Sequence, residues 1–172
     1  MKKRIAIIIA FKNFRDEEFL IPYHKLKDIF DIDVYSSDIG IAIGKLGARF
    51  QIVNHYKNLN PENYDLILFV GGPGGYNYLG DATIKKIIIS AYSSDKLLAA
   101  ICMAPLLIAE QGLLKNKNAT VFSGDKDKLT SYGASYTAKA VEISGNIITA
   151  DGPASADAFA DTIIQQLNNK SF

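Results

Sequence analysis

Three short runs of mainly apolar residues constrain the fold of this chain more than any other feature. They occupy positions 4–10, 65–70 and 97–101. A continuous apolar run of this length is typical of a strand that is buried on both faces of a parallel sheet. Segments with helical spacing lie between these runs, and the clearest is 82–93, with Ile84, Ile87, Ile88 and Ala91 expected to face inward. Strands that alternate with helices predict a mainly parallel sheet with helices on both faces.

The rest of the chain completes one domain. Its 172 residues can bury a stable core, and they contain no repeat, linker or low-complexity tract. Further strands are expected at 32–36, 41–43, 50–53, 119–122, 141–143 and 146–149. Further helices are expected around 19–30, at 105–111 with Gly112 closing the helix, and at about 155–167 with Ser155 as its cap. We therefore predict a single domain over residues 1–172.

The charge and cysteine content argue against several classes of function. The formal net charge is +1 at pH 7, with both signs interspersed. Without a basic stripe, neither nucleic-acid binding nor attachment to an anionic membrane has electrostatic support. A single cysteine excludes an intramolecular disulfide and a cysteine-cluster metal site, and it suggests a reducing compartment. Since no segment has the length of a secretory signal or a transmembrane helix, we expect a cytoplasmic protein.

The one cysteine, Cys102, follows the third apolar run without a break. A nucleophile elbow is a turn from a strand into a helix, so tight that the residues two positions before and after the nucleophile must be small. Here those residues are Ala100 and Ala104, and Pro105 can begin a helix because an N–H there would be unpaired anyway. A helix start also favours the thiolate. The alternative is that Cys102 is a buried core residue, as free cysteine often is, but the coincidence of these features favours a nucleophile.

Two other segments are expected beside Cys102, because the carboxyl ends of parallel strands meet at one edge of the sheet. Gly71 and Gly72 follow the second apolar run, and the amide of Gly72 could bind an oxyanion together with the amide of Met103. A glycine-rich turn is weak evidence when taken alone. An acidic segment at 16–18, which ends in Glu18, follows the first run; such residues ordinarily complement the dipole of a helix.

Several short motifs give the sequence a resemblance to the ThiJ/PfpI family that covers nearly the whole chain. Residues 99–105, AAICMAP, resemble the family's elbow, and Glu18 with Pro22 matches its E-x-x-x-P helix. Three more segments are similar to family motifs, namely 70–72 (VGG), 126–128 (KDK) and 149–155 (TADGPAS). The resemblance implies a flavodoxin-like three-layer α/β/α sandwich with a mainly parallel sheet and a cysteine nucleophile elbow.

The resemblance also implies roles for individual residues. Glu18 would contact Cys102, and a carboxyl group beside a thiolate is pushed toward its protonated form, which donates a hydrogen bond to sulfur. Arg49 is expected to approach the site from a neighbouring subunit, so we expect a homodimer or a larger homo-oligomer. Gly71, Phe122 and Asp151 are the other expected neighbours of the site.

Histidine is missing where some members of the family carry it. Peptidases of the family have histidine directly after the nucleophile, where this chain has Met103, and other members have one where Phe122 falls. His24 and His55 belong to no recognisable motif, so an ordinary surface or packing role is expected for each. A Cys-His-acid triad is therefore not visible.

These observations favour an enzyme of the glyoxalase or deglycase kind that acts on small reactive carbonyls without a metal or cofactor. Cys102 would be its nucleophile, and Glu18 would transfer protons. One alternative is a cysteine peptidase or amidase of the PfpI type, against which the missing histidine counts. The other is a non-enzymatic redox sensor or holdase chaperone that uses the oxidation of Cys102.

Overall fold

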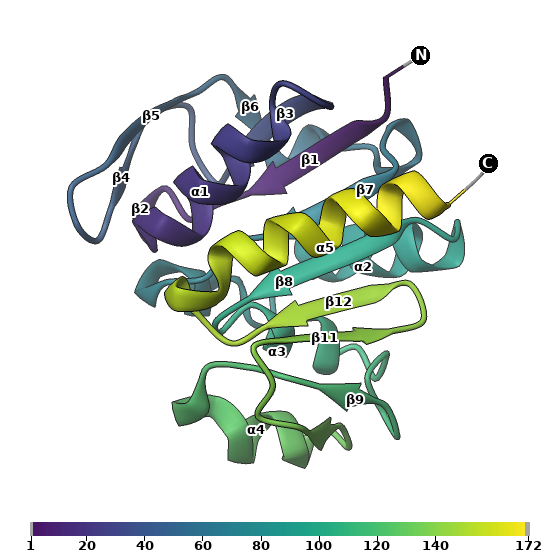
Figure 1. Ribbon diagram of the computed structural model, residues 1–172. Helices are drawn as coiled ribbons and strands as arrows, with labels where there is room; N and C mark the ends of the chain where they lie inside the picture. Colours follow the sequence, from purple (N-terminus) through teal and green to yellow (C-terminus); the bar gives the residue numbers. More distant parts are fainter. Residues whose placement is uncertain (1, 171–172) are drawn as a thin grey trace.

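The computed structural model describes residues 2–170, and its centre is a seven-stranded sheet (Figure 1). In spatial order the strands are β11 (Val141–Ser144), β12 (Ile147–Ala150), β8 (Leu97–Ile101), β7 (Leu66–Phe69), β1 (Arg4–Ile8), β3 (Asp31–Ser36) and β6 (Asn54–His55). All neighbouring pairs are parallel except β11 with β12. The three apolar runs form the adjacent central strands β1, β7 and β8, as predicted.

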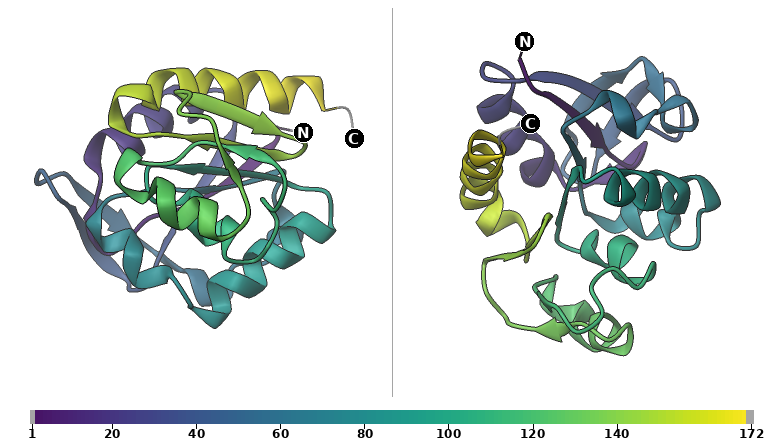
Figure 2. Two further views of the ribbon diagram at one scale, coloured as in Figure 1. Left: turned by 90° about the horizontal axis from the view of Figure 1, so that it is seen from below. Right: turned by 90° about the vertical axis from the view of Figure 1, so that its right-hand side faces the viewer.

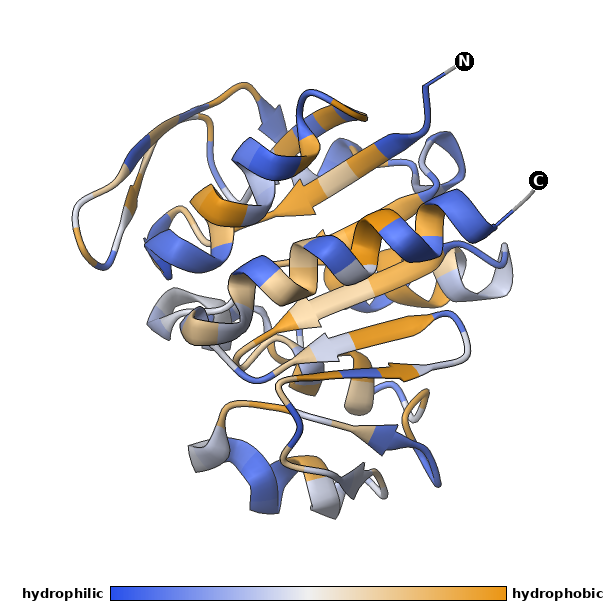
Figure 3. Ribbon diagram, viewed as in Figure 1, coloured by the Kyte–Doolittle hydropathy of each residue, from blue (hydrophilic) through white to orange (hydrophobic). Residues whose placement is uncertain are grey.

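Helices cover both faces of this sheet and produce the expected flavodoxin-like α/β fold (Figure 2). Helices α1 (Asp16–Leu26) and α5 (Ala156–Asn169) pack side by side on one face, where Phe19 and Phe159 meet Ile5 and Ile7 of β1. Helices α2 (Ala82–Ser93) and α3 (Pro105–Ala109) cover the other face. Figure 3 shows the reason: the central strands are hydrophobic along most of their length, whereas hydrophobic and hydrophilic residues alternate along α5. The buried residues of α5 recur at helical spacing, so they form one face of the helix.

A second, three-stranded sheet projects from the carboxyl edge of the central one. It consists of β2 (Lys12–Phe14), β4 (Gly40–Gly44) and β5 (Arg49–Ile52), in the order β2-β4-β5. Strands β4 and β5 form an antiparallel hairpin, the arm at the left of Figure 1. The sequence predicts strands at 41–43 and 50–53 but not β2, which is only three residues long and carries a lysine and an asparagine.

Short elements connect these layers. Five 3₁₀ turns are described within residues 2–170: η1 (Tyr56–Asn58), η2 (Pro61–Asn63), η3 (Pro73–Tyr78), η4 (Ser123–Asp125) and η5 (Pro153–Ser155). A small pair of strands, β9 (Asn118–Ala119) and β10 (Ser135–Tyr136), lies beside helix α4 (Lys126–Ser131) below β11 in Figure 1. Between residues 2 and 170, no helix is both long and apolar enough to cross a membrane.

Three local predictions are wrong. The strand expected at 119–122 ends at Ala119, because the amide of Phe122 donates to the carbonyl of Cys102 (2.8 Å) rather than to a neighbouring strand. The helix expected at 105–111 ends at Ala109. Ser155 stands at the start of α5 but does not cap it, since its hydroxyl donates to the side chain of Asp151 instead.

Candidate active site

Cys102 has the backbone conformation of a nucleophile elbow. It follows β8 directly, and its φ is 63°, a left-handed value that non-glycine residues adopt only when the surrounding structure enforces it. The amide of Cys102 donates to the carbonyl of Ala150 (2.9 Å), which ties the elbow to the end of β12. Ala100 and Ala104 are fully buried, and Pro105 begins α3, as the elbow pattern predicts. The thiol is held at the carboxyl edge of the sheet and is partly exposed.

Glu18 is a fully buried carboxyl group that reaches the thiol from the first turn of α1 (0 % exposed). Its Oε2 accepts a hydrogen bond from the amide of Gly71 (3.0 Å), and the interaction of its side chain with Cys102 lowers its pKa by less than burial raises it. Its Oε1 is enclosed and has no hydrogen-bond partner among the described residues. A buried oxygen that no N–H faces suits the O–H of a carboxylic acid, and burial raises the pKa of Glu18 to about 7.

The Gly71–Gly72 turn lets the backbone approach both groups. A Cβ on Gly71 would lie 2.6 Å from Cβ of Cys102 and 2.6 Å from Oε2 of Glu18, so only glycine leaves room for the pair. Gly72 has a φ of 103°, and its amide and that of Met103 face the sulfur of Cys102 and lower the pKa of the thiol. The two amides that the sequence assigns to an oxyanion site therefore converge on the thiol.

Glu18 and Cys102 titrate as a coupled pair. Burial raises the pKa of the Cys102 thiol to about 12, and the charge of Glu18 and the hydrogen bond to it raise it further, whereas the amides of Gly72 and Met103 lower it. The effect of the Glu18 charge on this pKa exists only while Glu18 is ionised. Since burial raises the pKa of Glu18 to about 7, the pair loses its first proton near neutral pH and its second proton with difficulty.

A cavity of about 260 Å³ opens beside the thiol. Its lining residues are Arg15, Glu18, Lys45, Gly72, Pro73, Tyr76, Cys102, Met103, Phe122 and Pro153. Phe122 is 44 % exposed and forms an aromatic wall with Tyr76, whose hydroxyl donates to Asp125 (2.6 Å). The sequence predicts Phe122 as a neighbour of the site but not Arg15, Lys45 or Tyr76. The cavity is small and mostly apolar, which suits a small organic substrate.

No histidine lines this cavity. His24 lies exposed on α1 against the ring of Tyr23, and Nδ1 of His55 accepts a hydrogen bond from the amide of Lys57 (3.1 Å). Both have the ordinary surface and packing roles that the sequence predicts. Within the described residues, the lining of the cavity therefore provides an acid and a nucleophile but no imidazole.

Two other predicted neighbours lie outside the cavity of a single chain. Arg49 is exposed on β5, opposite Ile43 of β4, and does not line the cavity. Asp151 is also absent from the lining; its carboxylate accepts the hydroxyl of Ser155 and shapes the turn that brings Pro153 to the site. Among residues 2–170, no group of three or more His, Cys, Asp or Glu side chains could hold a metal ion.

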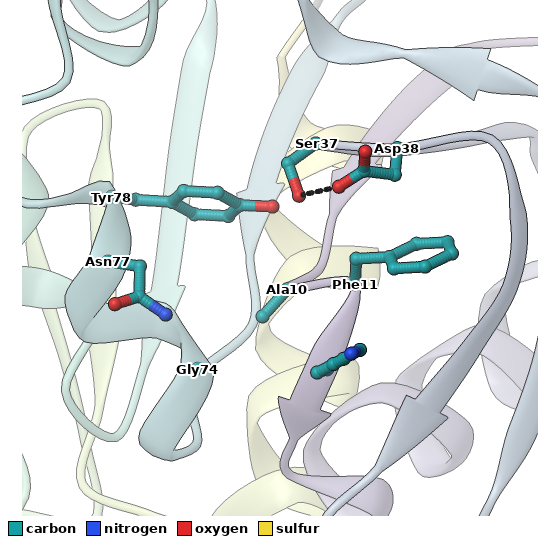
Figure 4. Close-up of a pocket in the computed structure, with 8 residues that line it drawn as sticks. Ala10, Phe11, Ser37, Asp38, Gly74, Asn77 and Tyr78 are labelled. Atoms are coloured by element: carbon teal, nitrogen blue, oxygen red, sulfur yellow. Dashed lines mark hydrogen bonds between the residues drawn. The ribbon is translucent and has the colours of Figure 1, made fainter.

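A second cavity, of about 200 Å³, lies at the ends of β1 and β3 (Figure 4). In this view the ring of Tyr78 points toward Ser37, whose hydroxyl donates to Asp38 (3.0 Å). Backbone packing separates this cavity from the thiol, since a Cβ on Gly74 would lie only 1.9 Å from the carbonyl oxygen of Lys12. The second cavity therefore does not belong to the Cys102 site.

The fold and this site define an α/β protein with a cysteine on a strand-to-helix elbow, and comparison with known proteins agrees. The sequence profile of the DJ-1/PfpI family matches residues 3–166. The chain is 33 % identical to the Drosophila melanogaster protein dj-1beta over 96 % of this chain and 90 % of that protein. It is 23 % identical to the Pyrococcus furiosus protein named deglycase PfpI, over 94 % of this chain and 98 % of that one. A solved ThiJ/PfpI domain protein from Brachyspira murdochii superimposes with a TM-score of 0.93 at 29 % identity, covering 99 % of this chain and 100 % of that one. The chain belongs to the DJ-1/PfpI family.

The pH dependence of alkylation tests how the pair holds its proton. We expect iodoacetamide to modify Cys102 with a first midpoint near pH 7, below the ordinary cysteine pKa of about 8.5. The coupled pair loses its first proton there, and a protonated Glu18 with two amides stabilises the form in which that proton has left the sulfur. Glu18→Leu removes that donor but keeps the burial, so the midpoint should rise by about one pH unit or more. Mass spectrometry of the adduct measures the rate at each pH without background from a second cysteine.

Glu142→Gln is the matched control, because Glu142 is a largely buried carboxyl group on β11 that does not line the cavity. It should leave the midpoint unchanged. A midpoint that falls in Glu18→Leu would contradict the prediction, since it would mean that the negative charge of Glu18, rather than its proton, dominates at the sulfur.

Proposed function

We propose that this protein is a cysteine-dependent, cofactor-independent enzyme that converts small α-oxoaldehydes into 2-hydroxy acids, as in the conversion of methylglyoxal to lactate. The observation that carries the proposal is the buried Glu18 carboxyl group, with an otherwise unpartnered Oε1, beside a cysteine held at a φ of 63°. A single proton carrier next to a nucleophile is what this chemistry requires. A relative named deglycase PfpI supports a role with reactive carbonyls.

The geometry supports a sequence of four steps. The sulfur of Cys102 attacks the aldehyde carbon, and Glu18 gives its proton to the aldehyde oxygen, which forms a hemithioacetal. The Glu18 carboxylate then removes the hydrogen from that carbon as a proton, and the electron pair forms an enediolate with the negative charge on the former ketone oxygen. Glu18 returns the proton to the neighbouring carbon, and the hydroxyl proton of the attacked carbon passes to the former ketone oxygen, which leaves a thioester of the 2-hydroxy acid. Water cleaves the thioester, so the sum is oxoaldehyde plus water to 2-hydroxy acid.

The amides of Gly72 and Met103 have a defined part in these steps. They already point at the sulfur, so an oxygen that forms on the attacked carbon lies near both donors. Fixed backbone donors of this kind stabilise developing negative charge without reorganising. The same arrangement disfavours peptide hydrolysis, because a leaving amine needs a proton donor within reach, and Glu18, the acid in the described lining of the cavity, is fully buried against the thiol and poorly placed for a bulky peptide.

The direct test is incubation of the purified protein with methylglyoxal and detection of lactate, with casein and aminoacyl reporters as parallel substrates. We expect slow lactate formation and no hydrolysis of the peptide substrates. Robust peptidase activity that depends on Cys102 would overturn the proposal. If no substrate is converted and mild peroxide converts Cys102 quantitatively to a stable sulfinate, a redox sensor would be favoured.

We also propose a cytoplasmic location, where a catalytic thiol stays reduced.

We further propose that the protein forms a homodimer through the outer face of the β4–β5 hairpin. Apolar side chains are exposed along this face, namely Ile39, Ile41, Ile43, Leu46 and Val53. Arg49 lies on the same face, because cross-strand partners in a hairpin point to the same side and Arg49 is paired with Ile43. The hairpin turn also borders the cavity through Lys45, so a second copy bound here would lie close to the site.

Light scattering at micromolar concentration checks this assembly. We expect the mass of a dimer or larger oligomer for the wild type, and the mass of a monomer for the double variant Ile41→Lys, Ile43→Lys, because two buried charges would destabilise the interface by several kcal/mol. Ile89→Lys, which changes an equally exposed isoleucine on α2, should leave the mass unchanged. A wild-type monomer would contradict the proposal and remove any role for Arg49 in the site.

A further inference from the structure

Two cationic side chains line the cavity beside Cys102, and only one of them already has an anionic partner. The guanidinium of Arg15 donates to both carboxylate oxygens of Glu17 (2.9 and 3.2 Å). Lys45 lies in the turn between β4 and β5, and no carboxylate lies within ion-pair distance of its ammonium group among the described residues. Its positive charge at the cavity is therefore available to a ligand.

The backbone at Lys45 is held in place by a buried carboxylate. Asp16, at the start of α1, accepts the amides of Leu46 (2.8 Å) and Ala48 (2.7 Å). A Cβ on Gly44 would lie 2.5 Å from Oδ1 of Asp16, so the turn packs directly on this carboxylate. The amide of Lys45 itself donates to the carbonyl of Phe14 (2.9 Å). These bonds join the turn to the helix that carries Glu18.

The other charged groups around the cavity do not neutralise the positive charge of Lys45. Glu17 is paired with Arg15, and Asp125 accepts the hydroxyl of Tyr76 on the aromatic side of the cavity. Burial raises the pKa of Glu18 to about 7, so this carboxyl group carries only part of a negative charge near neutral pH. A substrate in this cavity therefore meets a lining that includes both an ammonium group, on Lys45, and the aromatic rings of Tyr76 and Phe122.

We propose that Lys45 determines substrate specificity by binding a carboxylate on the substrate, so that the preferred substrates are α-oxoaldehydes that carry a carboxylate group at their far end. The inference rests on the proposed function and names its substrate class. Asp16 is a positioning residue in this arrangement, since it acts through the turn that carries Lys45. The reaction is unchanged: 4,5-dioxopentanoate plus water gives 2-hydroxyglutarate through the same four steps.

The first test does not depend on turnover. Iodoacetate and iodoacetamide alkylate the same sulfur and have nearly the same size, but only iodoacetate carries a carboxylate. A change in the pKa of the thiol alters both alkylation rates equally, so it does not affect their ratio. The ratio therefore measures the electrostatic effect of the cavity on an anionic reagent. We expect Lys45→Met to lower the iodoacetate-to-iodoacetamide ratio about five-fold, the effect of one unit charge a few ångströms away in water. Lys45→Arg should keep the ratio near that of the wild type.

Lys12→Met is the matched control, because Lys12 lies on β2, paired with Ile43 of β4 near the turn that carries Lys45, but lines the second cavity instead. It should leave the ratio unchanged. An unchanged ratio in Lys45→Met, or an equal fall in Lys12→Met, would overturn the assignment of Lys45.

The second test uses catalysis. We expect the wild type to show a higher kcat/KM for 4,5-dioxopentanoate than for its methyl ester, and Lys45→Met to remove most of that preference through KM. If neither compound turns over but the alkylation ratio still falls in Lys45→Met, the proposed function fails and anion binding by Lys45 stands. If both turn over equally and the alkylation ratio does not change, the specificity inference fails and the proposed function stands.

Discussion

Cys102→Ala should abolish the formation of lactate from methylglyoxal, and Glu18→Gln should lower kcat by about a hundred-fold to ten-thousand-fold, the range for loss of a general acid–base. Alanine removes the only thiol of the chain. Glutamine fills the same buried space and can still donate to sulfur, but it cannot release and recover a proton. The measurement is steady-state lactate production at several pH values, combined with a thermal melt to show that each variant is folded.

Glu142→Gln again controls for the loss of a buried carboxyl group and should keep full activity. Full activity in Glu18→Gln would contradict the mechanism, because no other carboxyl group lines the cavity among the described residues. Residual lactate formation in Cys102→Ala would show that the reaction does not require the sulfur.

The second large effect is on stability. Gly72→Ala should lower the free energy of unfolding by about 3 kcal/mol, which combines the penalty for a left-handed side chain with that for overpacking. Its φ is 103°, and its Cβ would lie 2.4 Å from the amide nitrogen of Arg15 and 2.7 Å from the carbonyl oxygen of Asn13. Both neighbours are backbone atoms, so no side chain can move aside. Chemical denaturation of the two proteins gives the difference.

Gly47→Ala separates the two causes. Gly47 has nearly the same φ, 99°, but a Cβ there would meet nothing within 4 Å. Gly47→Ala should therefore lower the free energy of unfolding only by the strain of the left-handed conformation, about 1 kcal/mol. If the two variants lost equal amounts of unfolding free energy, the close packing of Gly72 against the backbone of residues 13–15 would be contradicted.

The parts of the fold that depend on burial alone could be predicted from the sequence. The apolar runs at 65–70 and 97–101 form β7 and β8, and the segment 82–93 coincides with α2. Cys102 and its small neighbours could also be predicted, because a tight elbow limits side-chain size at fixed positions. In contrast, β2 is held by backbone contacts with β4 and with η3, and its three residues carry no pattern of their own.

The cavity could be predicted only in part, for a similar reason. Glu18 and Gly72 follow strands whose carboxyl ends must meet, so topology alone brings them to Cys102. Lys45 comes from a hairpin whose path depends on two hydrogen bonds to Asp16, and Tyr76 comes from a 3₁₀ turn. Neither residue belongs to a motif, and their positions follow from long-range contacts that a single sequence does not display.

Backbone and side-chain atoms contribute differently to this site, and the difference has a consequence for engineering the proposed activity. The atoms that would stabilise charge on the substrate are amides of Gly72 and Met103, and any side chain larger than hydrogen at Gly71 or Gly72 would disturb them. Lys45, Tyr76 and Phe122 are exposed and belong to three separate segments around the cavity. A combinatorial library restricted to these three positions would therefore vary the accepted substrate while leaving the reactive centre and the core intact.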